Sequence, residues 1–189
     1  MAILIAGLVI FLGIHTLTTL RETRAGLISR LGEGPYKGLY SLVAGLGLVL
    51  IIWGFGSYRS GGYIPVWNPP VWTRHVAMPL VWLAFIALAA AYAPAGRIKG
   101  LLRHPMLVAV KLWALAHLLA NGDLGSIILF GSVLAWAVWD RIAVKRRGDQ
   151  GAPRVTSFNK GDAIAVVVGT LAAVAMVYLH PIVIGVPIV

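Results

Sequence analysis

Residues 1–20 of the chain read MAILIAGLVIFLGIHTLTTL, and this stretch has no charged side chain before Arg21. An α-helix needs about 20 predominantly apolar residues to cross the hydrocarbon core of a bilayer. A secretory signal peptide carries basic residues ahead of its apolar core, whereas here the first basic residue comes after it. We therefore expect residues 1–20 to form a retained transmembrane helix.

Five further apolar segments follow along the chain, at roughly residues 36–56, 75–94, 105–120, 124–140 and 162–180. The segments 105–120 and 124–140 are at or below the lower limit of about 17 residues for a membrane-spanning helix. Because Asn121-Gly122-Asp123 joins them tightly, we expect them to form a short hairpin.

Composition supports a membrane protein. The 189 residues are 59% hydrophobic and 12% charged, and the mean hydropathy is +0.87. A soluble domain carries about twice that charged fraction. We predict an all-α, polytopic integral membrane protein with about six transmembrane helices in one bundle, forming a single domain over residues 1–189.

The net charge of +10 comes mainly from basic residues in alternate joints between the apolar segments. These residues are Arg21, Arg24, Arg30, Lys37, Arg97, Lys99, Arg103, Arg141, Lys145, Arg146, Arg147, Arg154 and Lys160. The positive-inside rule then places both termini on the non-cytoplasmic side, and we expect a multi-pass protein of the bacterial inner membrane. No basic patch alternates with aromatic residues, so we expect no nucleic-acid partner. The chain has no cysteine, which excludes disulfides and thiolate chemistry.

The acidic residues lie in joints or at the ends of the predicted helices, where Asp123 and Asp162 occupy N-cap positions. With no carboxylate buried in a span, we expect neither a carboxylate proton relay nor a paired-carboxylate hydrolase. Ala165, Gly169 and Ala173 recur at four-residue spacing, which predicts close helix packing. The aromatic residues near the helix ends, Trp136 and Trp139 among them, are interpreted as interfacial anchors.

Two of the five histidines, His15 and His117, lie inside predicted spans. An imidazole there needs a partner, because hydrocarbon offers it no water. Neutral imidazole is a good axial ligand for haem iron, and the flat apolar body of haem suits a helix bundle. His75, His104 and His180 lie near helix ends, where a histidine is ordinarily interfacial or hydrogen-bonded.

Axial ligands of one iron must lie at one depth in the membrane. At about 1.5 Å per residue, His15 lies about 9 Å from Arg21, and His117 lies about 9 Å from Lys111 but about 20 Å from His104. The pair therefore requires the stretch 98–110 to lie partly at the interface. Arg21, Arg103 and Lys111 would then meet the haem propionates, unless they serve as topology signals alone.

The sequence resembles the NnrU family, whose plant and cyanobacterial relative is 15-cis-ζ-carotene isomerase. The resemblance rests on short blocks in the expected order: Ile14-His15-Thr16 to Leu20-Arg21, Arg103-His104-Pro105, Leu112-Trp113-Ala114-Leu115-Ala116-His117, Asn121-Gly122 and Tyr178-Leu179-His180-Pro181. It implies a polytopic membrane protein and, in the isomerase branch, a haem b held by two histidines that match His15 and His117. In that branch a cysteine three residues before the second histidine takes part in ligand exchange, whereas this chain has Ala114. Bacterial members are linked with denitrification.

Three hypotheses remain open. The first is a haem b-binding membrane protein of the NnrU type, associated with nitrite and nitric oxide reduction, whose haem serves redox sensing, electron transfer or binding of a small gas. The second is a haem-dependent cis–trans isomerase of a carotenoid-like polyene that enters from the lipid bilayer. The third is a cofactor-free assembly subunit that binds another membrane protein or a second copy of itself. Arg103-His104-Pro105 is also similar to a tripeptide of membrane methyltransferases and sterol reductases. Those enzymes need further polar residues downstream, including carboxylates, and this chain offers Asp140-Arg141 and little else.

Overall fold

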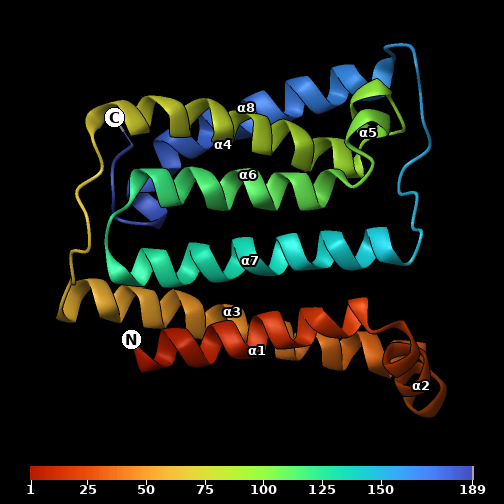
Figure 1. Cartoon of the computed structure of the whole chain (residues 1–189), viewed down its shortest axis with the longest axis horizontal. Coiled ribbons are helices and arrows are strands. Elements are labelled where there is room, and N and C mark those ends of the chain that lie inside the picture. The colour runs from red at the N-terminus through yellow and green to blue at the C-terminus, as the bar shows by residue number, and fades with distance from the viewer. Residues whose placement is uncertain (189) are drawn as a thin grey trace. The chain divides into compact units, whose positions relative to one another are not determined.

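The computed structural model describes residues 1–188, and this part of the chain is built of helices (Figure 1). In order, they are α1 (Ala2–Thr19), α2 (Arg21–Leu31), α3 (Glu33–Gly61), α4 (Val71–Tyr92), α5 (Arg97–Leu102), α6 (Pro105–Ala120), α7 (Leu124–Arg146) and α8 (Lys160–Val183). Six of them, α1, α3, α4, α6, α7 and α8, overlap the six apolar segments. The predicted all-α, polytopic membrane fold is confirmed.

Within the described residues, α1, α3, α4, α7 and α8 are long and apolar enough to cross a membrane, while α6 has 16 residues and is shorter. The prediction for the segment 124–140 was wrong, because α7 has 23 residues and continues past Asp140 to Arg146. Lys and Arg are good helix formers and interact favourably with the carboxyl-terminal end of a helix. The charged residues that seemed to end this segment therefore extend it.

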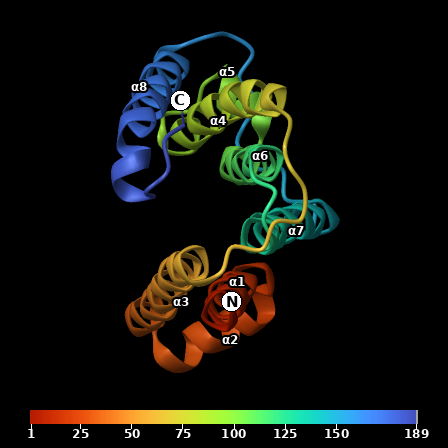
Figure 2. The ribbon, with the colours of Figure 1, turned by 90° about the vertical axis from the view of Figure 1, so that its left-hand side faces the viewer.

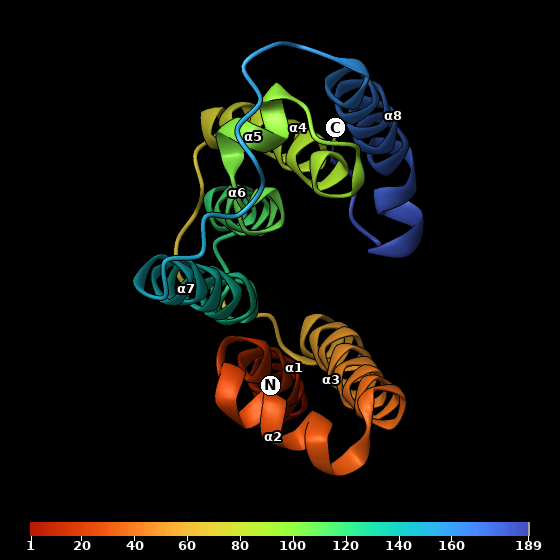
Figure 3. The same ribbon diagram turned by 90° about the vertical axis from the view of Figure 1, so that its right-hand side faces the viewer.

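Sequence reasoning also missed α2 and α5, which lie in joints between apolar segments. Leu20 separates α2 from α1, and α2 runs from the end of α1 to the start of α3 (Figure 3). None of the eleven residues of α2 is buried. A helix without a buried face gives no apolar periodicity, so the sequence held no signal for it.

The helices group into two compact units. Unit 1 comprises Met1–Asn68 and Asn121–Arg147, with α1, α2, α3 and α7, and unit 2 comprises Pro69–Ala120 and Gly148–Val189, with α4, α5, α6 and α8. Each unit draws on two separate parts of the sequence. The single domain, the hairpin of segments 105–120 and 124–140 and the orientation of the termini stay predictions.

Unit 1 is held by close contact between the backbones of α1 and α3 (Figure 2). A Cβ atom added to Gly47 would lie 2.7 Å from the backbone nitrogen of Phe11, and one added to Gly7 would lie 2.6 Å from that of Ile51. A Cβ on Gly54 would meet the backbone of Leu4. Small residues allow such an approach, which is how membrane helices gain packing energy.

The turn before α7 is fixed to the loop after α3. The amides of Val66 and Trp67 donate to the carbonyl of Gly122 at 2.8 and 3.0 Å, and the amide of Leu124 donates to the carbonyl of Ile64 at 2.9 Å. Asp123 caps α7 by accepting the Ser126 amide at 2.9 Å, as predicted. These bonds set where α7 begins.

In unit 2, α4 packs against both α6 and α8. A Cβ on Gly169 of α8 would lie 2.6 Å from the Cα of Ile86 in α4, and Ala165 is buried against Ala90 and Ala93. The packing role predicted for Ala165 and Gly169 is therefore confirmed.

The prediction for Asp162 was wrong, because Asn159 is the N-cap of α8 and Asp162 stands three residues later in a capping box. Both oxygens of the Asp162 carboxylate also accept backbone amides of α5, from Arg97 at 3.0 Å and from Ile98 at 2.6 Å. The sequence alone shows that a carboxylate lies at the start of a helix. It does not show that this carboxylate also accepts hydrogen bonds from a second helix, α5.

We predict that Gly47→Val destabilises the protein by about 1–3 kcal/mol, because the added side chain must push α1 away from α3. The measurement is thermal or detergent-induced unfolding of the purified protein. Gly45→Val is the matched control, since a Cβ at Gly45 in the same helix meets nothing within 4 Å. Equal stability of the two variants would contradict the close α1–α3 contact.

Candidate functional site

His15 lies in the last turn but one of α1, and its ring is oriented by its own helix. The Nδ1 atom is 2.6 Å from the carbonyl oxygen of Phe11, four residues earlier. A carbonyl oxygen can only accept, so Nδ1 carries the hydrogen and Nε2 carries the lone pair. This is the form in which histidine ligates a metal, with the second ring nitrogen held by a carbonyl.

Aromatic rings from three helices of unit 1 surround the His15 ring. The centroid distances are 4.3 Å to Phe11 of α1, 5.6 Å to Tyr40 of α3 and 5.9 Å to Trp136 of α7. Tyr40 and Trp136 meet the imidazole edge to face, which restricts its rotation. We call Phe11, Tyr40 and Trp136 the aromatic cage.

Tyr36 lies one helical turn before Tyr40, with its ring centroid 6.3 Å from that of Tyr40. It is 6% exposed, and within the described residues its hydroxyl has no hydrogen-bond partner. The guanidinium of Arg24 lies 5.9 Å from the centre of its ring. A buried hydroxyl without a partner costs about 1–3 kcal/mol.

A line of polar contacts joins α1 to α7 beside the aromatic cage. The indole nitrogen of Trp136 donates to the Thr16 hydroxyl at 3.3 Å, and this hydroxyl donates to the carbonyl of Leu12 at 2.8 Å. One turn on, the Thr19 hydroxyl donates to Asp140 at 2.6 Å. Together they fix how α1 lies against α7.

The expectation that no span contains a buried carboxylate was wrong. Asp140 is 9% exposed and lies within α7, which extends beyond the predicted end of that segment. Thr19, its partner, lies 121 residues away in the sequence, so the pair could not be seen before the helices were placed.

His117 lies near the end of α6 in unit 2 and repeats the arrangement of His15. Its Nδ1 is 2.8 Å from the carbonyl oxygen of Trp113, four residues earlier, and the Trp113 ring lies 4.9 Å away. The same reasoning places the hydrogen on Nδ1 and the lone pair on Nε2. Ala114 and Ala116 beside it are 0% and 1% exposed, so this part of α6 is tightly packed.

The cationic residues predicted to meet haem propionates differ in their placement. Arg103 forms the break between α5 and α6, with φ of 62°, and its guanidinium donates to Gln150 at 3.1 Å. It therefore lies beyond the start of α6, about 20 Å along the helix axis from His117. Lys111 is half-buried in the middle of α6, and Arg21 is exposed at the start of α2. Their role as propionate partners stays a prediction.

The other histidines have different surroundings. His104 Nε2 lies 3.3 Å from the carbonyl oxygen of Asp149, and His180 Nδ1 lies 2.6 Å from that of Val186. His75 is exposed on α4. Across residues 1–188 no group of three or more His, Asp or Glu residues could hold a metal ion.

Sequence reasoning selected His15 but missed the aromatic cage. Trp136 was interpreted as an interfacial anchor, yet its ring contacts His15 and its nitrogen binds Thr16. Tyr36 and Tyr40 stand four residues apart on α3, a spacing that puts them on one helix face. This spacing indicates that the two tyrosines share a helix face, but it does not indicate which helix packs against that face.

The fold and these buried polar side chains define a polytopic helical membrane protein. The chain belongs to the NnrU family, because the family model described as "NnrU protein" matches residues 3–188, nearly its whole length. No curated protein and no solved structure matches it.

We predict that Thr19→Val destabilises the protein by about 1–3 kcal/mol, because it leaves the buried Asp140 carboxylate without this donor. Unfolding of the detergent-purified protein measures the effect. Thr18→Val is the matched control, since Thr18 is exposed and bonds only within its own helix turn, to the carbonyl of His15. A loss no greater than that of the control would contradict the structural role of the Thr19–Asp140 pair.

Proposed function

We propose that this protein is a haem b-binding membrane protein of the NnrU type, which supports nitrite and nitric oxide reduction in the bacterial inner membrane. The ligands are His15 and His117. The observation that carries the proposal is the shared geometry of these residues: each lies inside an apolar helix and donates Nδ1–H to the carbonyl four residues earlier.

This geometry fits axial ligation. A second ring nitrogen held by a carbonyl fixes the tautomer, orients the ring and raises the basicity of the ligating nitrogen. It also satisfies one polar atom of each imidazole in a region without water. For His15, the aromatic cage adds an apolar surface suited to the face of a porphyrin.

The residues around His15 also fit the polar edge of haem. The unpartnered Tyr36 hydroxyl is a donor that a propionate would satisfy, and the Arg24 guanidinium next to the Tyr36 ring is a cation for the same carboxylate. Arg21, at the start of α2, is a further cation at this end of α1. When bound, haem supplies one-electron transfer or a site for a small gas.

Ala114 separates this proposal from the isomerase. The resemblance places a redox-active cysteine at that position in the isomerase branch, whereas Ala114 is 0% exposed and the chain has no cysteine. This chain therefore has no thiol that could take part in ligand exchange. In a cofactor-free assembly subunit, both histidines would serve helix packing alone.

The first test is the absorption spectrum of protein purified in detergent after haem-sufficient expression. We expect a Soret band typical of a haem with two histidine ligands, and its loss or conversion to a five-coordinate form in His15→Ala and His117→Ala. His75→Ala and His104→Ala are the controls and should keep the spectrum. Added imidazole should restore the six-coordinate spectrum of His15→Gly by replacing the missing ring. A colourless wild-type protein, or an unchanged spectrum in both alanine variants, would refute haem ligation.

The second test addresses the physiological role. In a denitrifying bacterium that lacks the gene, we expect wild type and His75→Ala to restore nitrite consumption without nitric oxide accumulation, and His15→Ala and His117→Ala to fail. All four proteins must reach the membrane in equal amounts, as judged by immunoblot. Full complementation by both ligand variants would contradict a haem-dependent role. A changed isomer ratio in cells that accumulate a cis polyene would favour the isomerase instead.

A further inference from the structure

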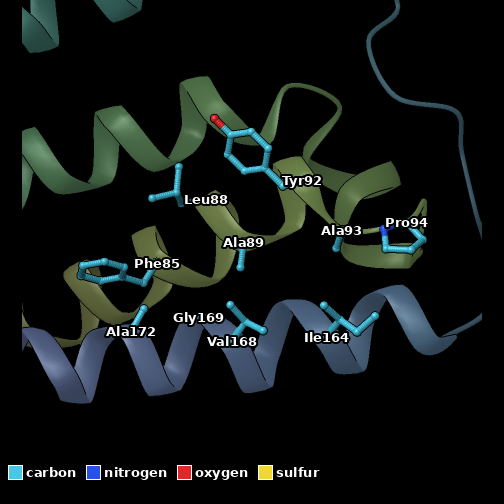
Figure 4. Close-up of a pocket in the computed structure, with 10 residues that line it drawn as sticks. All are labelled: Phe85, Leu88, Ala89, Tyr92, Ala93, Pro94, Ile164, Val168, Gly169 and Ala172. Atoms are coloured by element: carbon cyan, nitrogen blue, oxygen red, sulfur yellow. The ribbon is translucent and has the colours of Figure 1, made fainter.

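In unit 2, α4 and α8 border an apolar groove with a volume of about 550 Å³ (Figure 4). Its walls are large side chains, Phe85, Leu88 and Tyr92 from α4 and Ile164 and Val168 from α8. The volume is within the usual range of about 300–1,000 Å³ for ligand sites.

The groove follows from the packing of the two helices. Gly169 brings the backbones of α8 and α4 together at Ile86, so the small residues Ala89 and Ala93 point toward α8 at the base of the groove (Figure 4). The larger side chains of α4 and α8 then form the two walls of the groove, with a space between them. Tyr92 is 79% exposed, and its hydroxyl is directed away from α8, so the groove is open to the surroundings. Along a membrane-spanning helix those surroundings are lipid.

Two cationic residues lie close in sequence to the residues that line one end of the groove. Pro94 and Ile164 line that end. Arg97 follows Pro94 by three residues at the start of α5, and Lys160 precedes Ile164 by one helical turn at the start of α8. Both cations are exposed, and both belong to joints that the positive-inside rule places on the cytoplasmic side.

The groups around these two cations include an aromatic ring, one carboxylate and a third cation. The Arg97 guanidinium stacks on the Phe158 ring at 4.9 Å, which orients it without neutralising it. The carboxylate of Asp162 is buried, accepts the backbone amides of Arg97, Ile98 and Asn159, and also attracts the charge of Arg97. Arg97, Lys99 and Lys160 nevertheless outnumber this one carboxylate, so the group keeps a net positive charge. The Lys99 ammonium group donates to the carbonyls of Ala91 and Ala93 at 2.9 and 2.8 Å and so caps the end of α4.

We propose that this groove holds an anionic phospholipid, with an acyl chain along α4 and α8 and the phosphate at Arg97 and Lys160. Charge complementarity selects this occupant, because an uncharged hydrocarbon such as a polyene has no group for the two cations. Basic pockets between transmembrane helices on the cytoplasmic side bind anionic head groups. Each basic residue near the surface raises the affinity for anionic lipid by about fivefold.

The charge test uses delipidated protein in detergent, titrated with phosphatidylglycerol or phosphatidylcholine and followed by native mass spectrometry. We expect one tightly retained phosphatidylglycerol per chain, and affinity about 25-fold lower in the double variant Arg97→Gln/Lys160→Gln. The matched control is Arg30→Gln/Lys145→Gln, which removes one Arg and one Lys, both exposed, from unit 1. Equal weakening by both pairs, or equal binding of the two lipids, would overturn the proposal.

The groove test leaves the charges in place. Ala172→Phe fills the groove, whereas Ala175→Phe adds the same side chain to an exposed position of α8 outside the groove lining. We expect phosphatidylglycerol retention to fall in the first variant and to stay in the second, with equal helical content by circular dichroism. Retention in both variants would place the lipid elsewhere and overturn the proposal. So would a polyene that occupies the groove regardless of Arg97 and Lys160.

Discussion

Hydrocarbon offers no water, so every polar group inside a membrane span must find its partner within the protein. The described helices meet this constraint first within themselves, because His15, Thr16 and His117 each donate to the carbonyl four residues earlier. For a threonine, this bond satisfies the only hydrogen-bond donor of the side chain. For a histidine it leaves Nε2 as a directed lone pair. The same constraint that makes a membrane histidine tolerable therefore also prepares it to ligate a metal.

In unit 1, hydrogen bonds between helices also satisfy polar side chains. Trp136 donates to Thr16, which already donates to its own helix, and Thr19 donates to the buried Asp140. The His15 ring lies next to these bonds, inside the aromatic cage. Because α3 reaches α1 through glycines, Tyr40 can approach the imidazole as closely as Trp136 does. The position of His15 is thus determined by the packing of three helices.

Apolar run length predicted the six apolar helices, five of them long enough to span, and the membrane class, because length and hydropathy alone decide whether a helix can span. It failed for α2, which buries no residue, and for the end of α7, where charged side chains continue the helix. His15 and His117 could be selected because burial of an imidazole in a span is visible in the sequence. Their neighbours could not, since Trp136 and Thr16 lie 120 residues apart and only the placed helices bring them together.

We propose that His15 and His117 both present Nε2 to one haem iron, and this proposal can be tested directly. Pulsed electron paramagnetic resonance on the ferric protein, with histidine labelled by nitrogen-15, counts the imidazole nitrogens bound to that iron. We expect two strongly coupled histidine nitrogens in the wild type and one fewer in His15→Gly and in His117→Gly. A wild-type signal with one coupled histidine nitrogen or none, or one that either substitution leaves unchanged, would contradict it.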